Sequence, residues 1–133
     1  MSQENVEIVR RTIDAWNRCD VDAWMRGYHP QIEYTSAVLW RVEGPQTFRG
    51  HTEMRRFWDE WHSLWNLTND ISDLRDLGDT VVAIGVYRTR GNASGVGLEG
   101  PIAYVCEFDA GLARRVTAYL DPSQAREAVG LSE

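Results

Sequence analysis

The stretch between Asp79 and Asp121 limits what this chain can fold into more than any other part of it. Three segments in this stretch have the two-residue alternation of strands: Thr80–Arg90, Leu98–Asp109 and Ala113–Leu120. Turn-forming residues separate them, first Gly91-Asn92 with Ser94-Gly95 and then Asp109-Ala110-Gly111. We therefore predict a meander of three antiparallel strands. One face of such a meander needs apolar cover, and the first half of the chain offers helices for it.

The second strand of the meander has two different faces. Ile102, Tyr104, Cys106 and Phe108 fall on one face, and Ala103, Val105 and Glu107 fall on the other. We expect the first set to point inward and Glu107 to point toward solvent or a second copy of the chain. The outward face mixes apolar and polar groups, as expected of a surface that pairs with another sheet; its members are Val105, Glu107, Thr117 and Tyr119.

Helices are predicted mainly in the first half of the chain. Apolar spacing indicates helices over about Gln3–Arg18 and Thr52–Trp65, and Asp20 is expected to cap a shorter helix that Pro30 ends. The helix over Thr52–Trp65 places large apolar side chains on one broad face: Met54, Phe57, Trp58, Trp61 and Trp65.

Two more strands and a last helix complete the predicted order. A short strand is indicated where Ile32, Tyr34 and Ser36 alternate with Glu33, Thr35 and Ala37. Trp40–Phe48 is expected to be irregular, and Asp70–Leu77 to be a further strand. Asp121 and Pro122 are typical of a helix start, and Gly130 of a helix stop. Helices followed by a curved antiparallel sheet predict one α+β domain over residues 1–133.

Composition and motifs exclude several kinds of partner. The 133 residues carry a net charge of −6 with dispersed basic residues, which argues against nucleic acid or an anionic membrane. Two cysteines are too few for a disulfide framework or a zinc site, and no metal, phosphate-loop, nicotinamide or flavin motif is present. Neither a signal peptide nor a run of 18 apolar residues is seen. We expect a cytoplasmic protein whose chemistry, if any, needs no cofactor.

Several motifs, in their order along the chain, resemble the SnoaL-like branch of the NTF2-like superfamily. They are Val21-Asp22-Ala23-Trp24 through Tyr28-His29-Pro30 and Ile32-Glu33-Tyr34, then Phe48-Arg49-Gly50-His51, Phe57-Trp58, Arg90-Gly91 with Ser94-Gly95, and Tyr119-Leu120-Asp121 through Ala128, Gly130 and Leu131. The resemblance covers nearly the whole chain. It implies a cone in which a curved antiparallel sheet wraps around N-terminal helices and encloses a mostly apolar pocket, commonly in a homodimer. Relatives include ketosteroid isomerases, polyketide cyclases and limonene-type epoxide hydrolases.

The resemblance also implies where catalytic acids would stand, and this chain lacks them. The base position of the isomerases falls at or near Thr35, their helix-one tyrosine at Thr12 and their oxyanion-binding aspartate at Tyr104. The inward aspartate of the cyclases and epoxide hydrolases falls at Ala118. A threonine hydroxyl cannot act as a base at neutral pH. Of these residues, Tyr104 alone can donate a hydrogen bond to a developing oxyanion.

His62 and Tyr104 are the candidate catalytic residues. His62 stands four positions after Trp58 on the same helix flank, so it is either a general base near neutral pH or a histidine at the rim of an aromatic face. Arg88 interrupts an apolar strand and is either a clamp for a carboxylate or enolate or a partly exposed residue at a sheet edge. The other candidates for ligand contact are Trp16, Tyr28, Tyr34, Phe57, Trp58 and Cys106.

These observations leave three functions open. The leading one is a homodimeric SnoaL-like protein that accepts a small hydrophobic or polyketide-like molecule and acts as an isomerase, cyclase or hydrolase by general acid–base chemistry. The second is a ligand-binding module without turnover, favoured by the absence of acids at Thr35 and Ala118. The third is a dimeric scaffold whose pocket is filled by its own tryptophans. An open cavity with a buried ionisable group would favour the enzyme, an open apolar one the binding module, and a filled one the scaffold.

Overall fold

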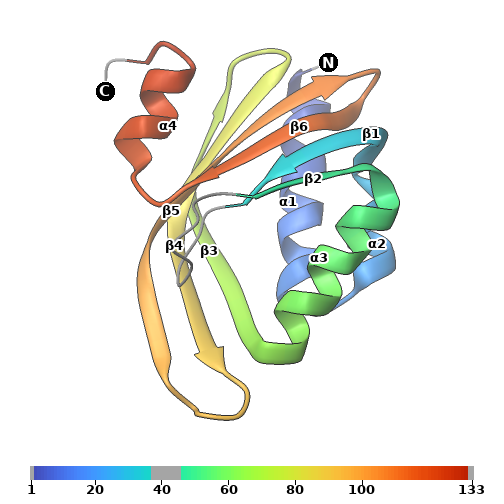
Figure 1. Cartoon of the computed structure of the whole chain (residues 1–133). Helices are drawn as coiled ribbons and strands as arrows, with labels where there is room; N and C mark the ends of the chain where they lie inside the picture. Colours follow the sequence, from blue (N-terminus) through green and yellow to red (C-terminus); the bar gives the residue numbers. More distant parts are fainter. Residues whose placement is uncertain (1, 37–45, 132–133) are drawn as a thin grey trace.

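The computed structural model describes residues 2–36 and 46–131. Within these ranges the elements follow in the order α1 (Ser2–Asn17), α2 (Val21–Arg26), β1 (Tyr28–Thr35), β2 (Thr47–Arg49), α3 (Gly50–Leu64), β3 (Trp65–Asp76), β4 (Thr80–Gly91), β5 (Gly97–Asp109), β6 (Leu112–Tyr119) and α4 (Pro122–Ala128) (Figure 1). The predicted helices and strands are all present. None of the described helices is both long enough and apolar enough to cross a membrane.

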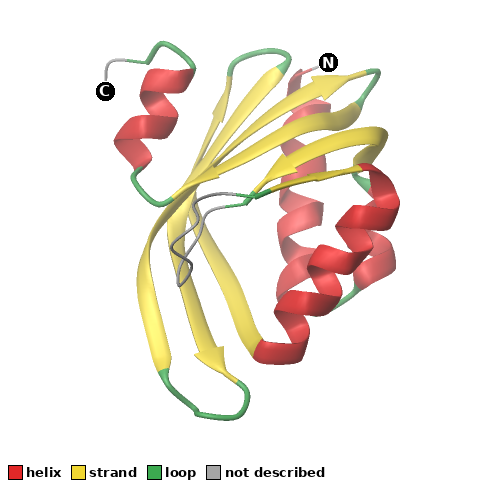
Figure 2. Ribbon diagram, in the orientation of Figure 1, coloured by secondary structure: helices red, strands yellow, loops and turns green. Residues whose placement is uncertain are grey.

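The strands form one curved, open sheet in the order β2-β1-β6-β5-β4-β3 (Figure 2). The meander β4-β5-β6 is antiparallel as predicted, and β3 and β2 pair antiparallel with β4 and β1. The β1–β6 pair is parallel, which makes the sheet mixed. The α+β architecture predicted from the sequence is confirmed, with this one parallel pairing added.

Helices cover both faces of the sheet, although the sequence led us to expect them on one. Figure 1 shows α1, α2 and α3 on one side and α4 on the other. The main core lies under the first three helices, and a smaller one lies under α4, where Ala125 packs with Val82, Ala103 and Val105. Val105 is only 4% exposed because α4 covers it. Our prediction that Val105 faces a second copy of the chain is therefore wrong.

The turn from α2 into β1 depends on a glycine. Asp20 caps α2 as predicted, since its side chain accepts a hydrogen bond from the Ala23 N–H at 3.2 Å. Gly27 then ends the helix, and a Cβ atom there would lie 2.5 Å from Thr12 Oγ1. The prediction that Pro30 ends this helix is wrong. Pro30 lies inside β1, in the part of the β1–β6 pairing whose register is irregular, where its missing N–H is tolerated.

Helix α3 passes directly into β3, without a connecting loop. Trp65 was predicted on the helix face, but α3 ends at Leu64 and Trp65 begins the strand. The strand predicted from Asp70 thus starts earlier than expected. A bulge between Ile71 and Asp73 then bends β3. The bulged backbone lies so close to β4 that any Cβ at Gly85 would collide with it.

The remaining boundary predictions concern the first strand, the segment before α3 and the last helix. β1 ends at Thr35, two residues short of the strand predicted through Ala37, and Ala37 lies outside the described residues. Residues 40–45 of the segment expected to be irregular also lie outside them, and Thr47–Arg49 form β2. The last helix begins as predicted: Asp121 accepts a hydrogen bond from the Ser123 N–H at 3.0 Å, and Pro122 follows the cap. Gly130, with φ of +79°, ends it.

Candidate ligand-binding site

A cavity of about 70 Å³ lies between the first three helices and the sheet. Its wall is mostly apolar: α1 contributes Val9, β5 contributes Ile102 and β6 contributes Val116. These side chains are nearly fully buried, whereas Phe108 and Leu120 line the cavity but keep partial exposure.

Six of the predicted site residues line this cavity: Trp16, Tyr28, Tyr34, Phe57, Tyr104 and Cys106. The rings of Trp16, Tyr28, Tyr34 and Phe57 form a continuous wall with Trp24, in which centroid distances are 5.3 Å from Trp24 to Trp16 and 5.0 Å from Trp24 to Tyr28. These tilted and edge-on contacts are the favoured geometries of aromatic pairs. The aromatic wall narrows the cavity without filling it.

His62 and Trp58 lie behind this wall and not on the cavity surface. The His62 ring stacks on Trp58 with centroids 4.0 Å apart and planes at 20°, and its centroid lies 4.7 Å from that of Trp16. His62 Nδ1 lies 2.9 Å from the Trp58 carbonyl oxygen, which accepts its hydrogen bond. The structure therefore places His62 on the predicted flank of α3. Trp16 lines the cavity and His62 does not.

Arg88 is turned away from the cavity. It stands on the opposite face of β4 from the buried Thr89, with a side chain 53% exposed. Its guanidinium forms long ion pairs with Asp70 on β3, at 3.6 Å, and with Glu99 on β5, at 3.7 Å. Arg88 thus bridges three strands on the outward face, and its predicted role as a clamp inside the pocket has no support from this position.

The titratable groups in the cavity wall are held in their neutral forms. Burial raises the pKa of the Tyr28, Tyr34 and Tyr104 hydroxyls above the ordinary value for tyrosine. Burial, with a smaller contribution from the Glu107 charge, raises the pKa of the Cys106 thiol to about 12. None of these groups is ionised at neutral pH, so they serve as hydrogen-bonding groups and not as bases.

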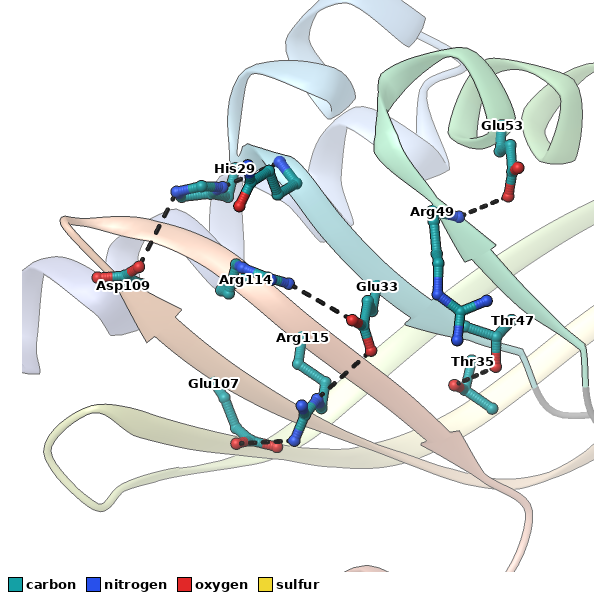
Figure 3. Close-up of polar contacts among 11 residues, drawn as sticks. His29, Glu33, Thr35, Thr47, Arg49, Glu53, Glu107, Asp109, Arg114 and Arg115 are labelled. Atoms are coloured by element: carbon teal, nitrogen blue, oxygen red, sulfur yellow. Dashed lines mark hydrogen bonds and ion pairs between the residues drawn. The ribbon is translucent and has the colours of Figure 1, made fainter.

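The residues that the resemblance aligned with catalytic groups of relatives do not all face the cavity. Thr35 points outward, and its hydroxyl lies 2.9 Å from that of Thr47 on β2 (Figure 3). Ser36, its neighbour, faces the cavity instead. Thr12 and Ala118 also line the cavity, and the Thr12 hydroxyl donates to the Ile8 carbonyl at 2.7 Å. No Asp, Glu, His, Lys or Arg is found among the cavity-lining residues of the described ranges.

Asn69 is a cavity residue that the sequence analysis missed. Its backbone N–H donates to Asn17 Oδ1 at 2.8 Å, and its carbonyl accepts from Asn17 Nδ2 at the same distance, so α1 and β3 are joined here. Beside it, Trp16 Nε1 donates to the Leu67 carbonyl at 2.9 Å. The side chain of Asn69 is turned inward, and its Oδ1 atom is buried without a hydrogen-bond partner. An asparagine placed one residue before the predicted strand carried no signal of this role.

Charged side chains gather on the outward face, away from the cavity. Figure 3 shows that Glu33 of β1 pairs with both Arg114 and Arg115 of β6, and that Arg115 also reaches Glu107 of β5. The separations are 3.8 to 3.9 Å, and the groups are one-third to one-half exposed. Glu107 therefore points outward as predicted. Within the described ranges, no three His, Cys, Asp or Glu residues come together in a way that would hold a metal ion.

A comparison with protein families identifies a domain that spans most of the residues around this cavity. The model of the SnoaL-like domain matches residues 9–116, which is most of the chain. The chain belongs to the SnoaL-like domain family. The matched range includes most residues that line the cavity, from Val9 on α1 to Val116 on β6. Among curated proteins, no relative matches the sequence significantly.

Solved structures share the fold of this SnoaL-like chain over nearly its full length. An NTF2-like protein from Burkholderia thailandensis is 27% identical, with a TM-score of 0.76 and coverage of 94% of this chain and 96% of that one. An NTF2-like protein of unknown function from Burkholderia pseudomallei is 18% identical, with a TM-score of 0.78 and coverage of 93% and 95%. A proposed polyketide cyclase from Xanthomonas campestris pv. campestris is 20% identical, with a TM-score of 0.77 and coverage of 92% and 94%. The NTF2-like cone predicted from the sequence is confirmed.

Proposed function

We propose that this SnoaL-like protein binds a small, largely apolar molecule in the cavity between its helices and its sheet. One observation carries the proposal: the cavity is open, its wall is apolar and aromatic, and the titratable groups in the described part of that wall are neutral at physiological pH. Sites of this composition bind ligands mainly by removing apolar surface from water, and a few polar groups orient them. Such a site needs no ionised side chain.

The size of the cavity limits the ligand. An apolar cavity of about 150 Å³ takes up benzene, and this one measures about 70 Å³. A ligand of about one small ring is therefore the upper limit, and it fits only if partly exposed lining residues such as Phe108 and Leu120 move to enlarge the cavity. The fold is shared with a proposed polyketide cyclase, but a multi-ring polyketide would need a much larger opening. We therefore favour a small ligand over the polyketide-like molecule considered from the sequence.

A catalytic version of the proposal has one supporting observation: Tyr104 offers a neutral hydroxyl donor inside the cavity, as oxyanion stabilisation requires. A proton-transfer reaction also needs a base, and His62 is the candidate nearest to the cavity wall through its contact with Trp16. In this version, His62→Ala would lower turnover by roughly 10²–10⁴-fold, and Tyr104→Phe would lower turnover more than it lowers ground-state binding. Unchanged turnover in both variants would remove these two residues from the mechanism.

We also propose that the protein forms a homodimer. With Val105 covered by α4, the outward surface left for a partner is the part of β1, β5 and β6 that carries Glu33, Glu107, Arg115 and Thr117. Ion pairs within one chain at this surface can be exchanged for equivalent pairs between two chains related by a two-fold axis.

Thermal denaturation with and without methylcyclopentane tests the binding function. A ligand that binds only the folded state raises the melting temperature with its concentration. The fluorescence of Trp16 and Trp24, which line the cavity, gives a second readout. Ala118→Leu adds methyl groups to the cavity wall and should weaken binding by roughly tenfold or more. Ala93→Leu, at an exposed turn, is the matched control and should bind as the wild type does. If methylcyclopentane and the alcohol and ketone of similar size all leave both signals unchanged, the binding proposal is wrong.

A further inference from the structure

The polar corner formed by Asn69 on β3 and Tyr104 on β5 carries hydrogen-bonding groups that the described residues leave unused. Asn69 is 7% exposed, and its side chain lines the cavity and has an oxygen atom, Oδ1, that is buried without a partner. Buried polar atoms in native proteins are nearly always paired, and an unpaired one costs free energy. An orphan atom at the wall of a ligand cavity is explained if the ligand supplies the missing partner.

The other end of the Asn69 amide interacts with Tyr104. A hydrogen bond from Asn69 lowers the pKa of the Tyr104 hydroxyl, against the larger rise caused by burial. A bond with this effect is donated to the phenol oxygen, so the Asn69 N–H is the donor. The hydroxyl hydrogen of Tyr104 is then free to be donated to a ligand, because no described residue accepts a hydrogen bond from it. The corner thus presents one free donor, the Tyr104 O–H, and one free acceptor, Asn69 Oδ1.

We propose that this corner selects a ligand with a hydroxyl group on an otherwise apolar frame. An alcohol or phenol oxygen accepts from the Tyr104 O–H, and the hydroxyl hydrogen is donated to Asn69 Oδ1. A ketone uses the first contact alone, and a hydrocarbon uses neither. The side-chain amide torsion of asparagine is broad, which allows Oδ1 to turn toward the bound group. The inference rests on the proposed function, and it adds the chemical class of the ligand.

Three ligands of similar size test the Tyr104 contact and the Asn69 contact separately: cyclopentanol, cyclopentanone and methylcyclopentane. Dissociation constants for each are measured by calorimetry on the wild type, Asn69→Leu and Tyr104→Phe. We expect Asn69→Leu to raise the dissociation constant of cyclopentanol roughly fivefold or more, and to leave the dissociation constants of the other two ligands within about twofold of the wild-type values. Tyr104→Phe should raise the dissociation constants of cyclopentanol and cyclopentanone and leave that of methylcyclopentane unchanged.

The variants are chosen so that the fold is kept. The hydrogen bonds between Asn69 and Asn17 use the Asn69 backbone, so they survive replacement of the side chain. Tyr104→Phe removes a single oxygen atom and provides an independent test. If cyclopentanol loses no more affinity than methylcyclopentane in both variants, the hydroxyl inference is wrong and the proposed function stands. If none of the three ligands binds the wild type, the proposed function and this inference are both overturned.

Discussion

The Cys106 thiol lies in the cavity wall near Tyr28 and Tyr104, and burial raises its pKa from 9.0 to about 12. The unfolded chain therefore releases this proton near pH 9, whereas the folded chain holds it until about pH 12. Over this window the folded state binds more protons, so stability falls as pH rises. The cavity tyrosines also have raised pKa values, so they lower the free energy of unfolding further from about pH 10 upward.

We predict that the free energy of unfolding decreases above about pH 9 by up to about 1.4 kcal/mol per pH unit for this thiol. Urea denaturation between about pH 8 and about pH 10 measures the slope. Cys106→Val should flatten it, and Cys19→Ser, at an exposed position, should not. An equal slope in all three proteins would show that Cys106 is not held neutral by the fold.

Single residues of the site were predictable where a repeating pattern placed them. Alternation along β5 put Tyr104 and Cys106 on the inward face, and both line the cavity. Helical spacing put His62 beside Trp58, and the two rings stack. Asn69 was missed because no pattern reached it: the strand that contains it was predicted to begin at Asp70. The orientation of Arg88 stayed open because its strand is apolar on both faces, and alternation then loses its meaning.

At the scale of elements, the bend in the sheet depends on the pairing of a bulge with a glycine. The β3 bulge near Ile71 presses its backbone against Gly85 of β4, and a Cβ atom there would collide with backbone that cannot move aside. We predict that Gly85→Ala lowers the free energy of unfolding by about 3 kcal/mol or more, at the upper end of overpacking costs. Gly97→Ala is the matched control.

Gly97 lies at the start of β5, and a Cβ atom added there would meet no other atom closer than 3.8 Å. Urea denaturation of the two variants should therefore give a large loss for Gly85→Ala and little change for Gly97→Ala. Similar losses in both would mean that the bulge adapts to a side chain at position 85. The bend would then not be fixed by this glycine.

The elements themselves were predictable from local signals, and their boundaries were not. Caps such as Asp20 and Asp121 are local hydrogen bonds, and both were found where the sequence indicated. The junction of α3 with β3 carries no Gly, Pro or Asn–Gly signal, so a tryptophan with helical spacing was assigned to the wrong element. The position of α4 on the outward face depends on tertiary contacts with Val82 and Val105, which no local pattern reports.

At the scale of the whole molecule, α4 covers only part of the outward face of the sheet, and we predict that a second copy of the chain binds the uncovered part. We expect light scattering at micromolar concentration to give about twice the mass of one chain. Arg115→Glu places a third acid beside Glu33 and Glu107 and should shift the protein toward monomer. Arg75→Glu, which alters an exposed charge next to Asp73 on β3, is the control. A wild-type protein with the mass of a single chain would contradict the homodimer.

The central claim is that an apolar molecule occupies the cavity, and methyl-detected NMR tests it most directly. In a titration with methylcyclopentane, the methyl groups of Val9, Ile102 and Val116 should shift together and saturate with one dissociation constant, because all three line the cavity. The methyl groups of Leu77 and Val96, which are exposed and do not line the cavity, should not move. Shifts confined to exposed methyl groups, or no shifts at any ligand concentration, would contradict the account.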